Sequence, residues 1–521
     1  MKTNKNPFFP ILVCLFFLLV NSPVTRSQEL VELKLPKSEK LIVKLMFKNG
    51  SMTDPKGKEG LTNLTATLIT DGGTKDKTST EIKDFLYPMA AVYYSVVDKE
   101  VSTFTFEFPK DFTAAFYPIL KGLILNPRFD EADFNRVKSN QQNFVDEVIK
   151  SSSDEEYSKK ALEDVLFRGN NFQHMVDGTS SGVKSIVLDD VKKHYKSFFT
   201  AQNLRIGIAG NYSAEFLKQL KTDLSTLSET TPQMPYAGKA NQPDGMQVEI
   251  ISKEPALGSA IFMGFPLAIT RSNDEFAALM IANSWLGEHR KSYSRLYQKI
   301  RQDRSMNYGD YSYIEWYNNG GSNMLPQPGF PRSSNYFAVW IRPVQTAKGL
   351  IGQYKELDGI KVGHAHFAIR MAIREMDQLI EKGLNQEDFE LTKTFLRSYI
   401  KLYITSPSKQ LGFLMDSRFY GRMDYIMELD KLLEKCTLAD VNAAIKRHFQ
   451  TKNMFVSIIT DASEAEPLAE SLRNNTASPM SYSNSLKSVL TPAIIAEDEV
   501  VAKYPLNVKN VKVVNTGEKF K

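Results

Sequence analysis

The chain has 521 residues, of which 42% are hydrophobic and 24% charged, a composition that is typical of globular proteins and excludes a disordered or fibrous one. Its length predicts two or more domains, because single hydrophobic cores stop growing well below this size. Residues 1–28 carry three of the 65 basic residues and no acidic one, so the rest of the chain has 62 basic against 60 acidic residues. A body this close to neutral gives no reason to expect nucleic-acid binding.

Residues 1–27 are predicted to be a secretory signal peptide. Lys2 and Lys5 form a charged start, the run from Phe8 to Val20 is apolar, and a small and polar stretch follows. The alternative is a membrane anchor, but the apolar run is short for a bilayer and Pro10 interrupts it. We therefore expect an exported protein, located in the periplasm or at the cell surface if the source is bacterial.

An internal repeat is the most informative feature of the rest of the chain. Residues 188–213 align without gaps with residues 438–463. Each copy reads as an amphipathic helix that starts near an Asp and ends at a Phe, followed by an Asn and a short strand of alternating apolar residues. Two copies this far apart predict two homologous lobes, each closing with a helix and then a strand.

The remaining patterns place strands in hairpins beside grouped helices. Strands are predicted at 30–35, 41–47, 91–97, 101–108, 247–252, 259–265, 311–316 and 336–341, and helices at 60–70, 79–86, 112–125, 131–150, 155–167, 274–286, 294–301, 366–382 and 386–402. This grouping favours an α+β fold, in which each lobe is a mainly antiparallel sheet packed with helices, over a parallel doubly wound sheet.

Composition divides the chain into five predicted parts. The signal peptide is followed by a first lobe at 28–225 and by an interlobe linker, rich in Thr, Pro, Gly and Gln, at 226–245. A second lobe spans 246–465, and a C-terminal tail spans 466–521. The first half of the tail is rich in Ser and Asn and is expected to be loose, whereas the apolar spacing of its end is expected to dock on the body.

Lobes of this size joined by a flexible linker resemble those of the insulinase family, which includes pitrilysin and the mitochondrial processing peptidase. Gly60 to Thr74 resembles the family's first helix with its Gly-Thr exit, and Leu125-Asn-Pro-Arg-Phe129 resembles its helix-ending Asn-Pro. Ser294 to Tyr308 resembles the signature of the second lobe. The resemblance covers residues 30–520, and the order of these short motifs along the chain is more specific than any one of them. It implies the duplicated fold of that family.

The resemblance also locates the family's zinc site, and this chain departs from it. Active members carry H-x-x-E-H on the first helix, where two His hold zinc and the Glu is the general base. The corresponding residues here are Asn63, Ala66 and Thr67; Asn and Thr are poor ligands and Ala cannot take a proton. Asp146 and Glu147 lie near the position of the family's distal Glu ligand, although two acids on a helix more often form a solvated face. The resemblance therefore implies a degenerate zinc site, no metal cofactor and no hydrolysis by this chain alone.

No other segment offers a replacement metal site. The six histidines include no H-x-x-H or H-x-x-x-H pair, and the spacing of His364 and His366 favours packed or exposed rings over a shared helical face. Cys14 lies in the leader, which leaves Cys436 alone in the mature chain and excludes an internal disulfide.

Two residues of the second lobe match the family's Arg and Tyr, namely Arg301 and Tyr308. In the family these groups come from the lobe opposite the zinc and touch the peptide near the scissile bond. An Arg fork binds a carbonyl or carboxylate, and a Tyr hydroxyl donates to a developing oxyanion. The spacing alone is more typical of a surface Arg and a packed Tyr, and it is the resemblance that favours a role for both in substrate binding. The Gly- and Pro-rich loop at 318–332 either contacts a substrate or partner, or is a surface excursion.

The resemblance thus implies that this chain is the non-catalytic, substrate-binding subunit of a heteromeric peptidase that acts on peptides. The assembly would be a heterodimer, and the zinc would be bound by the partner chain. A second hypothesis is an exported peptide-binding or scaffold protein with no peptidase role. A third is an active peptidase with an unfamiliar metal site, which stoichiometric zinc in the pure protein would reveal.

Overall fold

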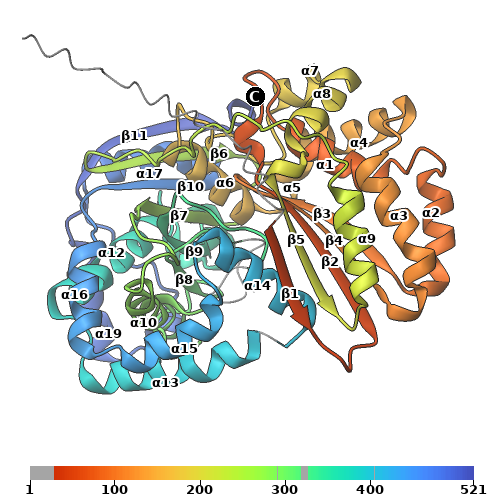
Figure 1. The fold of residues 1–521 in the computed structure, drawn as a ribbon. Coiled ribbons are helices and arrows are strands. Elements are labelled where there is room, and N and C mark those ends of the chain that lie inside the picture. The colour runs from red at the N-terminus through yellow and green to blue at the C-terminus, as the bar shows by residue number, and fades with distance from the viewer. Residues whose placement is uncertain (1–28, 290, 318–326, 404) are drawn as a thin grey trace, which may run out of the picture.

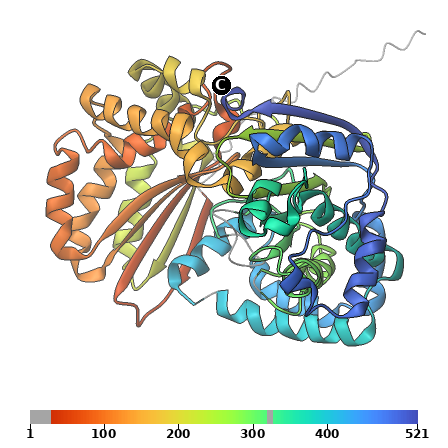
Figure 2. The same ribbon diagram turned by 180° about the vertical axis from the view of Figure 1, so that it is seen from behind.

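The computed structural model describes residues 29–289, 291–317, 327–403 and 405–521. The predicted signal peptide and most of the Gly- and Pro-rich loop therefore lie outside the described residues. Two lobes lie side by side, the first coloured red to yellow and the second green to blue in Figure 1, and the view from behind in Figure 2 shows the same division. Each lobe contains one sheet with helices packed against it, so the predicted α+β fold of two homologous lobes is confirmed.

The sheet of the first lobe has the strand order β1-β5-β2-β4-β3. Strand β5 pairs parallel with β1 and antiparallel with β2, and the pairs β2–β4 and β4–β3 are antiparallel. The strands are β1 (Glu29–Lys34), β2 (Lys40–Phe47), β3 (Val92–Val97), β4 (Ser102–Pro109) and β5 (Leu204–Gly210). The sheet is thus mainly antiparallel, and β3 is its outer edge.

The sheet of the second lobe repeats this order with one strand added, β11-β6-β10-β7-β9-β8. Strand β10 pairs parallel with β6 and antiparallel with β7, as β5 does with β1 and β2. The strands are β6 (Met246–Lys253), β7 (Ser259–Pro266), β8 (Asp310–Tyr313), β9 (Tyr336–Val344), β10 (Met454–Asp461) and β11 (Val508–Asn515). The duplication read from the sequence is therefore a duplication of sheet topology.

The repeated segments occupy equivalent places in the two sheets. In the first lobe, α8 (Leu188–Phe198) leads into β5, and α9 (Ala214–Leu224) follows. In the second lobe, α16 (Leu438–His448) leads into β10, and α17 (Ala462–Arg473) follows. Each copy thus delivers the strand at which parallel pairing changes to antiparallel pairing.

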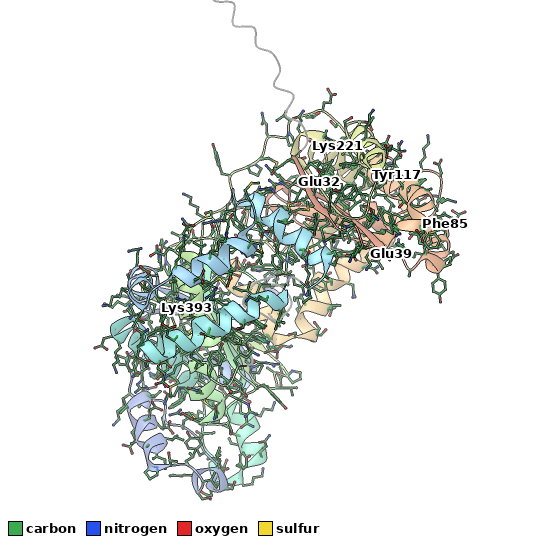
Figure 3. The ribbon with its side chains drawn as sticks, turned by 60° about the horizontal axis from the view of Figure 1, so that its bottom comes forward. Glu32, Glu39, Phe85, Tyr117, Lys221 and Lys393 are labelled. Atoms are coloured by element: carbon green, nitrogen blue, oxygen red, sulfur yellow. The ribbon has the colours of Figure 1, made fainter. Side chains whose placement is uncertain are left out.

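Helices cover one face of each sheet and enclose its main hydrophobic core. The first lobe uses α1 (Leu61–Asp71), α2 (Ser79–Leu86), α3 (Thr113–Leu125), α4 (Glu131–Asn143), α8 and α9. The second uses α10 (Phe276–Gly287), α12 (Ala365–Lys382), α13 (Gln386–Tyr403), α15 (Tyr425–Lys435), α16, α17 and α19 (Pro492–Ala502). Figure 3 shows the two lobes from below, with Lys393 of α13 on the second and Glu39, Tyr117 and Phe85 on the first.

The other face of each sheet is covered by a helix from the opposite lobe. Helix α14 (Pro407–Phe419) of the second lobe lies against β1, β2 and β5, and α6 (Asp154–Leu166) of the first lobe lies against β7 and β10 (Figure 1). A Cβ at Gly207 would lie 2.4 Å from Sδ of Met415, so a larger residue where α14 meets β5 would displace that side chain. At the equivalent place in β10, the hydroxyl of Ser158 in α6 donates to the carbonyl of Ser457 at 3.1 Å. The two lobes are therefore joined by exchanged helices.

A buried ionic cluster also joins the lobes. The guanidinium of Arg332 in the second lobe donates twice to Asp98 at 2.7 Å and also pairs with Glu163, both in the first lobe. Burial raises the pKa of Glu163, but Arg332 and then Lys99 outweigh it and hold that pKa at about 2. Because an unpaired buried charge is costly, breaking such a pair typically costs about 3–5 kcal/mol.

The segments predicted as linker and tail have the following structure. No helix or strand lies in residues 229–243, and Asn241 donates its backbone N–H to the carbonyl of Leu166 at 2.7 Å. Residues 466–521 contain the end of α17, the short helix α18 (Asn484–Lys487), α19 and β11. Beyond β11, the ring of Phe520 packs on Tyr157 of α6 with 5.3 Å between centroids. The end of the described chain thus lies against the first lobe.

Candidate functional site

Helix α1 carries the residues that match the family's zinc motif. Its N-terminus is held by Asp54, whose carboxylate accepts the backbone N–H of Gly60 and of Thr62, each at 2.7 Å. Ala66 is fully buried, whereas Asn63 and Thr67 are half-buried. The helix thus presents an amide and a hydroxyl, with only a methyl group at the position of the catalytic Glu.

Asn63 is bound to Gln141 of α4, a residue that the sequence did not single out. The Asn63 amide donates to Oε1 of Gln141 at 3.2 Å, and Nε2 of Gln141 donates to the carbonyls of Gly60 at 2.9 Å and Asp177 at 2.8 Å. The oxygen and both hydrogens of this amide are therefore engaged. An amide pair ties α1 to α4 where the family binds metal.

Among the described residues, neither of the two acids considered as a distal ligand has a hydrogen bond with Asn63. Asp146 accepts from Nε2 of Gln142 at 2.7 Å, and Glu147 is exposed. Burial raises the pKa of Asp146, but bonds from Ser180 and Gln142 outweigh it and lower that pKa. Within the described ranges, no group of three or more His, Cys, Asp or Glu side chains is placed to hold a metal ion.

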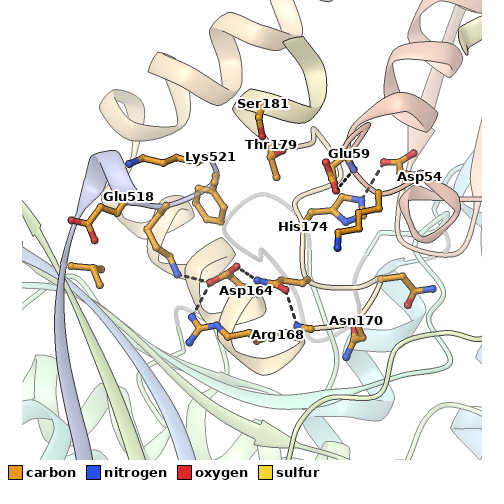
Figure 4. Close-up of a pocket in the computed structure, with 18 of the residues that line it drawn as sticks. Asp54, Glu59, Asp164, Arg168, Asn170, His174, Thr179, Ser181, Glu518 and Lys521 are labelled. Atoms are coloured by element: carbon orange, nitrogen blue, oxygen red, sulfur yellow. Dashed lines mark hydrogen bonds and ion pairs between the residues drawn. The ribbon is translucent and has the colours of Figure 1, made fainter. Parts of the chain in front are cut away.

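A cavity of about 1030 Å³ lies beside the N-terminus of α1. Figure 4 shows Asp54 facing His174 on one side and Asp164 near Arg168 on another. Nε2 of His174 lies 3.2 Å from the Asp54 carboxylate, and Lys519 pairs with Asp164 at 2.5 Å. The cavity wall thus combines paired groups with lysines, among them Lys56, Lys512 and Lys521, that make no ion pair within the described part of the chain.

The structure brings Arg301 and Tyr308 together. Arg301 lies in a short π-helix (Tyr297–Gln302), and Tyr308 lies just before β8. The guanidinium carbon of Arg301 is 5.8 Å from the centroid of the Tyr308 ring, a cation–π distance. Tyr308 is 78% exposed. Among the described residues, neither side chain contacts the three positions that match the zinc motif, so the two groups of residues are separate features of this chain.

The turn that carries Tyr308 stands on a buried acid, Asp310. Burial raises the pKa of Asp310 well above its usual range, while the bond from Asn307 and the charges of Arg342 and Arg301 act in the opposite direction. Its Oδ1 accepts from Asn307 at 2.7 Å, and its Oδ2 has no hydrogen-bond partner within the described part of the chain. The base of the turn is therefore rigid while its tip is open to solvent.

Comparisons with known protein families identify the relatives of this chain. Residues 31–180 match the family model for insulinase (peptidase family M16), and residues 185–339 match the model for the peptidase M16 inactive domain. Together the two matches cover more than half of the chain. This chain belongs to the insulinase family. It is a member whose first lobe lacks H-x-x-E-H and whose second lobe matches the inactive domain of the family.

Two curated insulinase-type relatives carry the name of uncharacterized zinc protease. YmxG of Bacillus subtilis is 21% identical over 254 residues, which cover 48% of this chain and 59% of that protein. SCO5738 of Streptomyces coelicolor is 22% identical over 229 residues, which cover 43% of this chain and 42% of that protein. The matches thus span roughly half of the length of these relatives. The name zinc protease therefore belongs to those proteins and is not transferred to this chain.

Solved structures show the same fold at low sequence identity. A crystal structure of the peptidase M16 inactive domain from Pseudomonas fluorescens has a TM-score of 0.70 at 16% identity and covers 84% of this chain and 96% of its own. A protease from Helicobacter pylori has a TM-score of 0.68 at 13% identity, covering 83% and 97%. A chain of Complex III2 from Candida albicans has a TM-score of 0.66 at 11% identity, covering 84% and 94%. The whole two-lobed body therefore has the insulinase architecture.

His364, His366 and Cys436 of this insulinase homologue are packed inside the second lobe. Nε2 of His364 lies 3.0 Å from the carbonyl of Ser481, and Nδ1 of His366 lies 2.9 Å from the hydroxyl of Ser471. Burial lowers the pKa of His366 to about 3, so its ring is neutral at physiological pH. Cys436 is buried and free, and burial raises its pKa to about 11. No helix among the described residues is both long and apolar enough to span a membrane.

Sequence reasoning missed two residues that organise these features, Gln141 and Glu155. Gln141 lies five positions before Asp146, and the search for an acid at the distal ligand position passed over it. Glu155 pairs with Arg342 across the lobes, and 187 positions separate them in the sequence. The only local signal concerned Gln141, which is a polar residue at a buried position of α4.

Proposed function

We propose that this chain is the non-catalytic, substrate-binding subunit of a two-chain insulinase-type peptidase that acts on peptides. In this proposal a partner chain carries H-x-x-E-H, the zinc and the general base, while Arg301 and Tyr308 of this chain contact the bound peptide. The chain itself holds no metal cofactor and hydrolyses nothing alone. It is exported, and it works in the periplasm or at the cell surface as a heterodimer with its partner.

The observation that carries the proposal is the state of Arg301. Its guanidinium has no hydrogen bond or ion pair within the described part of the chain, although 37 ion pairs are found there. It lies beside an exposed Tyr hydroxyl that is also without a hydrogen bond there. An unpaired fork and a free hydroxyl suit a peptide carbonyl, which accepts from both.

The degenerate motif supports the proposal that the partner chain carries out catalysis while this chain binds the substrate. Ala66 offers no base, and the Asn63 amide is engaged by Gln141. Peptide hydrolysis by this family needs a metal-bound water and a carboxylate to take its proton. Those groups have to come from another chain if the chain takes part in proteolysis.

The test is an activity assay with a quenched peptide library, on this chain alone and mixed with a zinc-bearing relative from the same source. We expect no turnover alone and turnover in the mixture that Arg301→Ala or Tyr308→Phe lowers by roughly 10²-fold, the usual loss for a transition-state hydrogen-bond donor. Tyr236→Phe is the matched control, because Tyr236 is also exposed, at 98%, but lies between the lobes in sequence. Chelator-sensitive turnover by this chain alone would refute the proposal.

A second candidate function is an exported peptide-binding or scaffold protein with no peptidase role. The observation that favours it is the outer edge of β3, where Val92 and Tyr94 are 50% and 43% exposed, beside Phe85 and Tyr87 of the preceding segment. An unpaired strand edge flanked by aromatic side chains suits an extended peptide. Peptide binding that survives Arg301→Ala and Tyr308→Phe, with no effect on turnover by any zinc-bearing relative, would favour this function.

A further inference from the structure

A second arginine lies against Tyr308, from the neighbouring strand β9. The guanidinium carbon of Arg342 is 5.8 Å from the centroid of the Tyr308 ring, the same distance as that of Arg301. The exposed ring therefore has two cations against it. They differ in one respect, which is that Arg342 is held by another residue and Arg301 is not.

The residue that holds Arg342 belongs to the other lobe. Nε of Arg342 donates to Oε1 of Glu155 at 2.7 Å, and Nη2 donates to Oε2 at 3.2 Å. Glu155 lies in the first turn of α6, the first-lobe helix that covers the second-lobe sheet. A two-bond contact of this kind fixes the plane of a guanidinium as well as its position. The first lobe thus holds the Arg342 guanidinium, which in the second lobe also contacts Tyr311 and the ring of Trp340.

Arg342 also anchors the backbone of the turn that presents Tyr308. Its N–H donates to the carbonyl of Gly309 at 3.3 Å, and its carbonyl accepts from Nδ2 of Asn307 at 3.0 Å. Gly309 has φ +153°, and a Cβ there would lie 2.2 Å from the hydroxyl of Tyr311, so no larger residue fits. Both residues flanking Tyr308 are therefore bonded to Arg342.

We propose that Arg342, held by Glu155, is the positioning residue that orients Tyr308 and Arg301 for peptide binding. This inference rests on the proposed function and adds a condition to it, namely that the peptide site in the second lobe forms only while α6 of the first lobe is in place. Movement of the lobes relative to each other would then switch peptide affinity without any change in the residues that touch the peptide.

The competing explanation is that Glu155 and Arg342 merely join the lobes. The charge exchange Glu155→Arg with Arg342→Glu separates the two roles, because it keeps an ion pair across the lobes and removes the guanidinium from Tyr308. Glu155→Gln is the milder variant, since it keeps one hydrogen-bond acceptor for Arg342 and removes the charge together with the second acceptor. Arg397→Leu is a matched control, because it breaks an Arg–Asp pair between α13 and α15, with Asp430 at 2.9 Å, inside one lobe.

The assay is fluorescence anisotropy with a labelled pool of random octapeptides, on full-length protein whose folding is checked by its thermal midpoint. We expect Glu155→Gln and the charge exchange each to weaken binding by roughly tenfold, the scale of a partly desolvated cation–π contact, and Arg397→Leu to bind as the native protein does. Native affinity in the charge exchange, or in Glu155→Gln, overturns the inference. Native affinity in Arg301→Ala and Tyr308→Phe overturns the proposed function instead, so the two failures are distinguishable.

Discussion

The region around α1 and the turn around Tyr308 differ in how their polar groups are used. In the first, the Gln141 amide makes three hydrogen bonds, the Asn63 amide is one of its partners, and Ala66 is sealed from solvent. In the second, Arg301 makes no hydrogen bond or ion pair among the described residues, and Tyr308 is exposed. Buried polar groups that satisfy one another stabilise a fold, whereas groups left unpaired at a surface are available to a ligand.

The contrast teaches that the residues of this insulinase homologue that match the zinc motif are packed into its scaffold. Asn63 donates to the side chain of Gln141, and Gln141 in turn donates to the backbone carbonyls of Gly60 and Asp177. The turn that carries Tyr308 is arranged differently, because its base is hydrogen-bonded to the protein and its tip is open to solvent. Substitutions in the two regions should therefore separate stability from binding.

The largest expected effect is that of a carboxylate at the former base position. Ala66→Glu should lower the free energy of unfolding by about 3–5 kcal/mol, because the new charge is buried without a partner. Thr67→Glu is the matched control on the same helix, and it should cost less than about 1 kcal/mol because Thr67 is half-exposed. Urea denaturation measures both, and equal losses would show that the interior around α1 is not sealed.

A smaller loss is expected when the amide clamp is removed. Gln141→Ala removes the side-chain donor from the carbonyl of Asp177 and one of the two donors from the carbonyl of Gly60, which keeps the N–H of Leu64, so the free energy of unfolding should fall by about 1–3 kcal/mol. Asn140→Ala, at the exposed neighbouring position, should change it by less than about 0.5 kcal/mol. Peptide binding by the folded fraction, measured by anisotropy, should be unchanged in both variants. A loss of binding in Gln141→Ala would show that the region around α1 also contributes to the peptide site.

The smallest effect on stability is expected at the open turn. Tyr308→Phe and Arg301→Ala should each change the free energy of unfolding by less than about 0.5 kcal/mol, because neither side chain makes a hydrogen bond or ion pair within the described residues. The same variants should weaken peptide binding. A substantial destabilisation in the denaturation curve would mean that this pair, like Asn63 and Gln141, belongs to the scaffold.

Much of the fold could be predicted because the repeat carries it. The alternation of apolar residues at 204–208 and 454–458 predicted two strands, and the similar sequence around both strands predicted two homologous lobes. Helix α14 could not be predicted from periodicity, because it is packed between the lobes and its buried residues, such as Leu411, Phe413 and Met415, do not follow one helical stripe. Amphipathic patterns report helices that face water on one side.

The candidate site was predictable to a smaller extent. Asn63, Ala66 and Thr67 were located through a motif within eight residues, and Arg301 and Tyr308 through a motif of similar length. The roles of these residues stay predictions. Gln141 and Glu155 escaped because each acts through a partner far along the chain, and a single sequence carries no record of which distant residues meet.

The exchange of α6 and α14 has a consequence for any attempt to study the halves separately. A fragment that ended near residue 230 would carry α6 with no sheet to cover, and its own β5 would lose Met415. The complementary fragment would expose the aromatic face around Phe262 and Trp340. The unit of cooperative unfolding is therefore the pair of lobes, and two co-expressed fragments should associate because each completes the other's interior.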